Sequence, residues 1–78
     1  MRVTVVVRPK PGILDPQGDA IARALAALGL AVSEARVGKV IDLEVDSSDP
    51  AEAERIARAA ADGVLANALI ESYEVVSG

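Results

Sequence analysis

The chain has 78 residues, of which 51% are hydrophobic, and a formal net charge of −4. A chain of this length buries only about 60% of the surface that it exposes when unfolded, so a single core is marginally stable. Without Cys or His, it has no disulfides, no thiolate chemistry and no imidazole base or metal ligand. Its acidic charge and single aromatic residue, Tyr73, also argue against nucleic-acid binding. We therefore expect one domain spanning 1–78 that associates with other chains.

The hydrophobic residues are distributed in short stretches along the chain. No apolar run reaches the length of a membrane span, and the first residues are too few and too alternating for a signal peptide. We therefore expect a cytoplasmic protein that makes no membrane contact.

The first predicted elements are a strand and a helix joined by a stiff loop. Residues 2–8 are rich in β-branched side chains and alternate in polarity, which predicts a strand. Residues 9–12 hold two prolines and a glycine and predict a loop. A helix is expected to begin at Asp15, a good N-cap followed by proline, and to end at Gly29. Its predicted core stripe consists of Ile21, Ala24, Leu25 and Leu28.

The rest of the chain predicts two strands, a helix and a closing strand. Residues 30–37 form the weaker strand, and a tight turn at Gly38-Lys39 leads to a clearly alternating strand over 40–46. A second helix begins at Asp49 and ends near residue 66, and the last strand spans 70–76. The core stripe of this helix is predicted to be Ala53, Ile56, Ala57, Ala60 and Val64.

This order of elements predicts an α+β, ferredoxin-like β-α-β-β-α-β sandwich. Its four-stranded antiparallel sheet has the strand order 4-1-3-2, and both helices lie on one face. The open face of the two central strands carries opposite charges, with Arg2 and Arg8 facing Asp42, Glu44 and Asp46. Two interpretations stay open: the charges pair across the strands in a solvated face, or the face docks a second copy.

The loop from Arg8 to Gly18 is the least ordinary segment, because it holds three prolines together with exposed apolar residues. Two interpretations stay open: the prolines only shape the turn, or the stiff loop presents a contact surface to another protein. An anion site at Lys10 and Gly12 is disfavoured, because the spacing fits no phosphate-binding motif and Asp15 would repel phosphate. No Ser or Thr has an evident base nearby, so no active site is expected in this chain.

Several of these segments together resemble one protein family over nearly the whole chain. In chain order they are Lys10-Pro11-Gly12-Ile13-Leu14-Asp15-Pro16-Gln17-Gly18, Leu28-Gly29, Arg36-Val37-Gly38-Lys39, Leu65-Ala66-Asn67 and Ile70-Glu71-Ser72-Tyr73. Their order and spacing are similar to those of the PurS family, the small subunit of phosphoribosylformylglycinamidine synthase. One departure is Ala68, where the family commonly has proline.

The resemblance implies a non-catalytic role in the fourth step of de novo purine synthesis. The small subunit of the family bridges a large synthetase subunit and a glutaminase subunit, and is thought to assist ammonia transfer between them. It implies no cofactor in this chain, since ATP and Mg²⁺ belong to the large subunit. It also implies a homo-oligomer, either a dimer or a tetramer.

Carried over by position, the resemblance yields two groups of candidate interface residues. The first group is Lys10, Gly12, Leu14, Asp15, Gln17 and Gly18, and the second is Arg36, Gly38, Lys39, Asn67, Glu71 and Tyr73. An alternative of another class is a stand-alone dimeric regulatory domain that binds a small molecule. Only Gly12 and Gly18 hint at the glycine-rich ligand loop that such a domain would need.

Overall fold

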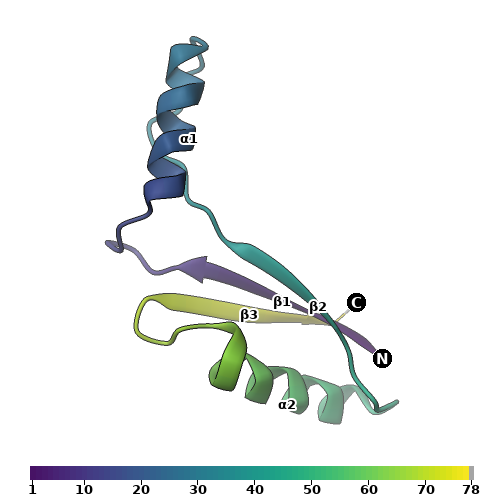
Figure 1. Ribbon diagram of the computed structural model, residues 1–78. Helices are drawn as coiled ribbons and strands as arrows, with labels where there is room; N and C mark the ends of the chain where they lie inside the picture. Colours follow the sequence, from purple (N-terminus) through teal and green to yellow (C-terminus); the bar gives the residue numbers. More distant parts are fainter. Residues whose placement is uncertain (78) are drawn as a thin grey trace.

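The computed structural model describes residues 1–77, which form three strands and two helices (Figure 1). In chain order the elements are β1 (Arg2–Pro9), α1 (Pro16–Ala27), β2 (Lys39–Glu44), α2 (Pro50–Ala60), the π-helical turn η1 (Ala61–Leu65) and β3 (Glu71–Ser77). In this part of the chain, no helix is both long enough and apolar enough to cross a membrane. The α+β class is confirmed, but the complete four-stranded sandwich is not.

The sheet has the order β2-β1-β3, and both pairings are antiparallel. In the central strand, Val5 lies opposite Ile41 of β2 on one side and Val75 of β3 on the other. These strands correspond to the first, third and fourth predicted strands, so the predicted 4-1-3 neighbours are confirmed. The prediction of a fourth strand at the β2 edge was wrong within residues 1–77.

Residues 30–38 are not a strand, because they find no neighbour with which to pair. After α1 the chain returns past the helix and enters β2 directly, with no hairpin at Gly38-Lys39 (Figure 1). Gly38 lies so close to β1 that a Cβ there would overlap the Val7 carbonyl oxygen. The glycine thus serves close approach to the central strand and not the predicted tight turn.

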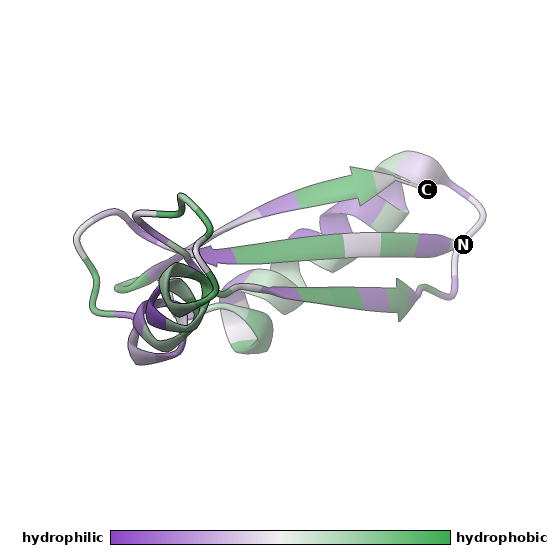
Figure 2. Cartoon of the chain, turned by 90° about the horizontal axis from the view of Figure 1, so that it is seen from above, coloured by the Kyte–Doolittle hydropathy of each residue, from purple (hydrophilic) through white to green (hydrophobic). Residues whose placement is uncertain are grey.

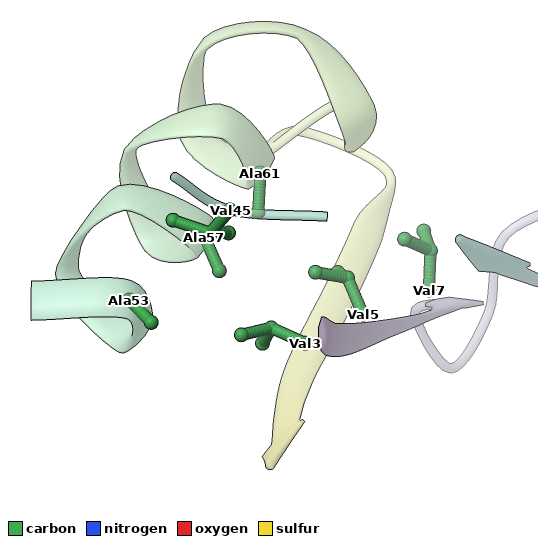
Figure 3. Packing of buried hydrophobic residues seen from close by; sticks show 7 residues of the cluster. All are labelled: Val3, Val5, Val7, Val45, Ala53, Ala57 and Ala61. Atoms are coloured by element: carbon green, nitrogen blue, oxygen red, sulfur yellow. The ribbon is translucent and has the colours of Figure 1, made fainter. Parts of the chain in front are cut away.

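The core lies between β1 and α2. Alternation along β1 directs three valines to one face of the sheet, and a stripe of alanines at intervals of four covers them (Figure 3). The buried residues of the core are Val3, Val5, Val7, Val45, Ala53, Ala57 and Ala61. Small alanine side chains bring the helix close to the sheet, and neither helix covers the opposite face (Figure 2).

Two predicted core positions of α2 need correction. Val64 is 83% exposed, because the chain widens into η1 after Ala60 and the helical spacing no longer holds. Ala60 itself is only half-buried. The stripe continues instead through Ala61, which is fully covered.

Helix α1 lies beyond the end of the sheet and packs against none of the strands (Figure 1). Its predicted core stripe was therefore wrong: Ile21 is 44% and Leu28 74% exposed. The radius of gyration is 15.7 Å, whereas a compact chain of this length has about 11.5 Å. We call α1 together with residues 28–38 the arm, and the sheet with α2 and η1 the body.

The local signals at the ends of α1 act as the sequence predicts. Asp15 caps the first turn, and Gly29 follows the last turn with a φ of +80°. Leu30 N–H donates to the Leu25 carbonyl and Gly29 N–H to the Ala26 carbonyl, which completes a Schellman motif. The helix is thus specified locally, although its position relative to the sheet is not.

Candidate functional site

Nine of the twelve candidate residues gather in three clusters, all near the end of the sheet that carries the arm. The clasp joins the two segments at the base of the arm and contains Asp15, Gly18 and Arg36. The β3 pocket contains Lys10, Asn67, Glu71 and Tyr73. The cationic pocket contains Gly38 and Lys39 and shares Arg36 with the clasp.

The Asp15 carboxylate is the centre of the clasp. One oxygen accepts a hydrogen bond from Gly18 N–H at 2.9 Å, and the other accepts from Val37 N–H at 2.7 Å. The bonds from the Val37 and Gly18 amides, with the nearby Arg36 charge, lower the pKa of Asp15 below its ordinary 3.8. One side chain therefore caps α1 and also ties the returning segment to the start of the helix.

Arg36 closes the clasp from the opposite direction. Its Nη1 donates to the Ile13 carbonyl at 3.0 Å and its Nη2 to the Lys10 carbonyl at 2.9 Å. Gly18 lets the two segments approach, since a Cβ there would overlap the carbonyl oxygen of Ala35. The direction of the arm therefore depends on side-chain bonds and close backbone packing, and not on a β-ladder.

The β3 pocket lies where η1 leads into β3 and has a volume of about 230 Å³. Lys10 Nζ donates to the Ala68 carbonyl at 2.6 Å, and Glu71 Oε1 accepts from Asn67 N–H at 2.7 Å. These bonds brace the turn between η1 and β3. Lys10 and Glu71 therefore stabilise the turn between η1 and β3 within this chain.

Tyr73, the only aromatic residue, crosses from β3 to η1. Its hydroxyl donates to Asp62 Oδ1 at 2.8 Å. This hydrogen bond, together with partial desolvation and the Asp62 charge, raises the pKa of Tyr73 above its ordinary 10.0. The ring packs against the margin of the core, so Tyr73 has a structural role within the chain.

The cationic pocket lies between the end of β1 and the start of β2 and has a volume of about 310 Å³. Arg36 and Lys39 come from the returning segment and β2, and Arg8 from β1 completes the pocket. Arg8 pairs with Glu74 on β3 at 3.2 Å, while Arg2 lies 3.9 Å from Glu44. Cross-strand pairing on the open face is thus present, but Arg8 pairs with β3 instead of the predicted carboxylates of β2.

Three candidate residues lie outside the clusters. Gly12 has a φ of +83°, so it serves the turn that leads into the arm. Leu14 is 88% exposed, and Gln17 is exposed on the first turn of α1. Two residues outside the twelve candidates, Arg8 and Asp62, join the clusters through contacts between distant segments, which no local motif signals. The sequence marked Arg8 only as a charge on the open face of the sheet.

These clusters were compared with the other kinds of site that the sequence raised. No group of three or more acidic side chains within residues 1–77 could hold a metal ion. The first-turn amide of α1 that an anion would need is bound by Asp15, and Lys10 is directed to Ala68. Both glycines that hinted at a ligand loop have a backbone role, which removes the observation that favoured a small-molecule regulator.

The chain is similar to known proteins over nearly its whole length. The family model of PurS, described as phosphoribosylformylglycinamidine (FGAM) synthase, matches residues 2–77. The chain is 42% identical over 76 residues to the PurS subunit of that synthase from Mycobacterium leprae, covering 95% of this chain and 91% of the relative. A crystal structure of the PurS subunit from Thermotoga maritima superposes with a TM-score of 0.88 at 34% identity, covering 96% and 87% of the two chains.

A further structural relative comes from a larger assembly. A chain in the structure of PurLQS from Thermotoga maritima superposes with a TM-score of 0.87 at 34% identity, covering 96% of this chain and 93% of that one. These relatives match almost end to end, with the arm included in the superposed length. The chain therefore belongs to the PurS family of phosphoribosylformylglycinamidine synthase subunits.

Proposed function

We propose that this chain is the non-catalytic small subunit of the synthase in purine biosynthesis, bridging the large synthetase subunit and the glutaminase subunit. The observation that supports it most is the match over residues 2–77, together with the likeness to a chain of the PurLQS structure. We assign ATP and Mg²⁺ to the large subunit and no cofactor to this chain. This role places the protein in the cytoplasm.

The proposed contribution to the reaction is to hold the other two subunits in place so that ammonia passes between them. An extended shape suits this task, since the chain measures 48 × 24 × 13 Å. Its arm and body offer separate surfaces at opposite ends of the long axis (Figure 1). We infer that different partners contact these different ends.

We also propose that the arm mediates self-association. A 12-residue helix is marginal in water unless its apolar face packs against something. The exposed apolar residues of the arm and the loop before it are Leu14, Ile21, Leu28, Leu30 and Val32. A second copy would bury this surface by presenting the same arm in return, as in most two-fold symmetric dimers.

The exposed area supports the same proposal. The chain exposes 5380 Å², whereas a compact folded monomer of 78 residues exposes about 4,450 Å². The excess of roughly 900 Å² is similar to the area that one partner contributes to an interface of standard size, about 800 Å². Sedimentation should show a dimer or tetramer, and the melting temperature should rise with protein concentration.

The decisive experiment is reconstitution from the three purified subunits. Glutamine-dependent formation of formylglycinamidine ribonucleotide should require this chain, whereas ammonia-dependent formation by the large subunit should require it much less. Sedimentation of the mixture should show all three subunits in one species. Full glutamine-dependent activity without this chain would refute the proposed role.

A further inference from the structure

Two of the three cations of the cationic pocket form no salt bridge within residues 1–77. Among residues 1–77, neither Arg36 nor Lys39 has a carboxylate oxygen within 4 Å, and only Arg8 is paired. By contrast, Arg55 and Arg58 on α2 both pair with glutamates of their own helix. In a chain of net charge −4, two unpaired cations in one pocket create a local positive field.

Two of the three cations are held in place before any ligand arrives. Arg36 is fixed by the carbonyls of Ile13 and Lys10 and lies near the Asp15 carboxylate, with which it forms no salt bridge. Arg8 is held by Glu74 at 3.2 Å. Because these long side chains are already ordered, binding an anion costs little additional side-chain entropy.

The lining indicates the chemical class of the ligand. Besides the cations, the pocket is lined by Val6, Pro9 and Val40, and Val40 is 65% exposed. Cationic and apolar side chains that line one pocket suit a carboxylate carried on an aliphatic stem, because the cations attract its charge and the apolar lining contacts its stem. A nucleotide fits less well, since no aromatic side chain lines the pocket to stack on a base.

We propose that this pocket binds a glutamate or aspartate side chain from an acidic segment of another subunit of the synthase. The proposal rests on the proposed function and adds the location and the chemistry of one subunit contact. The contact lies beside the clasp, because Arg36 belongs to both. Ordering of the arm base and binding of the acidic segment therefore support one another.

The test compares charge reversal inside and outside the pocket in the three-subunit assembly. Lys39→Glu should weaken assembly about tenfold or more, since it places like charges together at the contact. Arg55→Glu makes the same charge change on exposed α2 and should alter assembly less than twofold. The assembly affinity of Lys39→Gln should lie between those of the wild type and Lys39→Glu. The affinity of the wild type should fall more steeply with salt concentration than the affinity of Lys39→Glu.

Each outcome decides the proposal. Because Lys39 is exposed, the isolated Lys39→Glu variant should melt as wild type does, so weaker assembly does not reflect unfolding. Equal assembly affinities for Lys39→Glu and Arg55→Glu would contradict the proposed binding at the pocket but leave the proposed function intact. The pocket would be a small-anion site instead if the wild type bound inorganic phosphate with a submillimolar Kd and Lys39→Glu lost this binding but assembled as the wild type does. Failure of the wild-type chain to assemble would overturn both proposals.

Discussion

The body and the arm are stabilised in different ways. In the body, alternating valines of β1 meet the alanine stripe of α2, and the core is closed within one chain. In the arm, local signals specify a helix and its caps, but the apolar face stays exposed. The body is therefore expected to depend on its own packing, and the arm on the clasp and on contact with other chains.

The largest expected effect is loss of the body. Val5→Asp places a charge at a position with no exposed surface, at the centre of the β1–α2 contact. An uncompensated buried charge costs about 3–5 kcal/mol, which is similar to the stability of about 3–5 kcal/mol that a single core of this size supplies at most. Circular dichroism should show an unfolded chain, and a cooperative melt near the wild-type temperature would contradict this account of the core.

The matched change in the arm should leave the body folded. Ile21→Asp alters an apolar side chain of α1 that touches no strand, so secondary structure of the sheet and α2 should persist. Self-association should weaken by about 30-fold or more, as for a central interface residue. Val64→Asp is the control, because Val64 is an exposed apolar residue on η1, outside the arm. Unchanged sedimentation of Ile21→Asp would assign self-association to another surface.

A smaller effect is expected where the arm joins the body. Gly18→Ala forces a methyl group against the Ala35 carbonyl oxygen and should cost about 1–3 kcal/mol in the arm base. Gly63→Ala is the control, since a Cβ there meets nothing within 4 Å. Hydrogen exchange should speed up in α1 of the first variant and stay unchanged in the body. Equal hydrogen-exchange rates of α1 in both variants would show that Gly18 is not needed to hold the arm in place.

These contrasts explain how far the sequence could predict the structure. Alternation along β1, Asp-Pro at both helix starts and Gly29 at a helix end are local signals, and each was confirmed. The position of α1 is not a local property, because an apolar helical stripe looks the same whether it packs on its own sheet or on another chain. The order of elements predicted that α1 packs on the same sheet face as α2 and that residues 30–37 add a fourth strand, and the structure shows neither within residues 1–77.

In the candidate site, too, the sequence predicted local features better than contacts between distant segments. The resemblance to PurS proposed twelve candidate residues, and nine of them gather near one end of the sheet. It could not indicate that Asp15 bonds to Val37 or that Tyr73 bonds to Asp62. Those contacts join segments that only the fold brings together.

The clasp should make the arm sensitive to acid. Because the pKa of Asp15 is lowered on folding, its contribution is present above the ordinary value of 3.8 and is lost as the pH falls through the lower folded-state pKa. Asp15→Asn keeps one acceptor oxygen and should remove this part of the pH dependence. Hydrogen exchange of α1 between pH 5 and pH 2.5 measures it, and identical profiles for the two proteins would contradict the assignment.

The smallest expected effect lies in the body, at the sole tyrosine. The pKa of Tyr73 is raised by its bond to Asp62, so the folded state retains this proton more strongly than the unfolded state. Its contribution is therefore present below pH 10.0 and is lost as the pH rises through the higher folded-state pKa. Since no other aromatic residue absorbs, an ultraviolet titration reports Tyr73 alone. Asp62→Asn should lower the midpoint towards 10.0, while Asp15→Asn should leave it unchanged, because the clasp belongs to the arm.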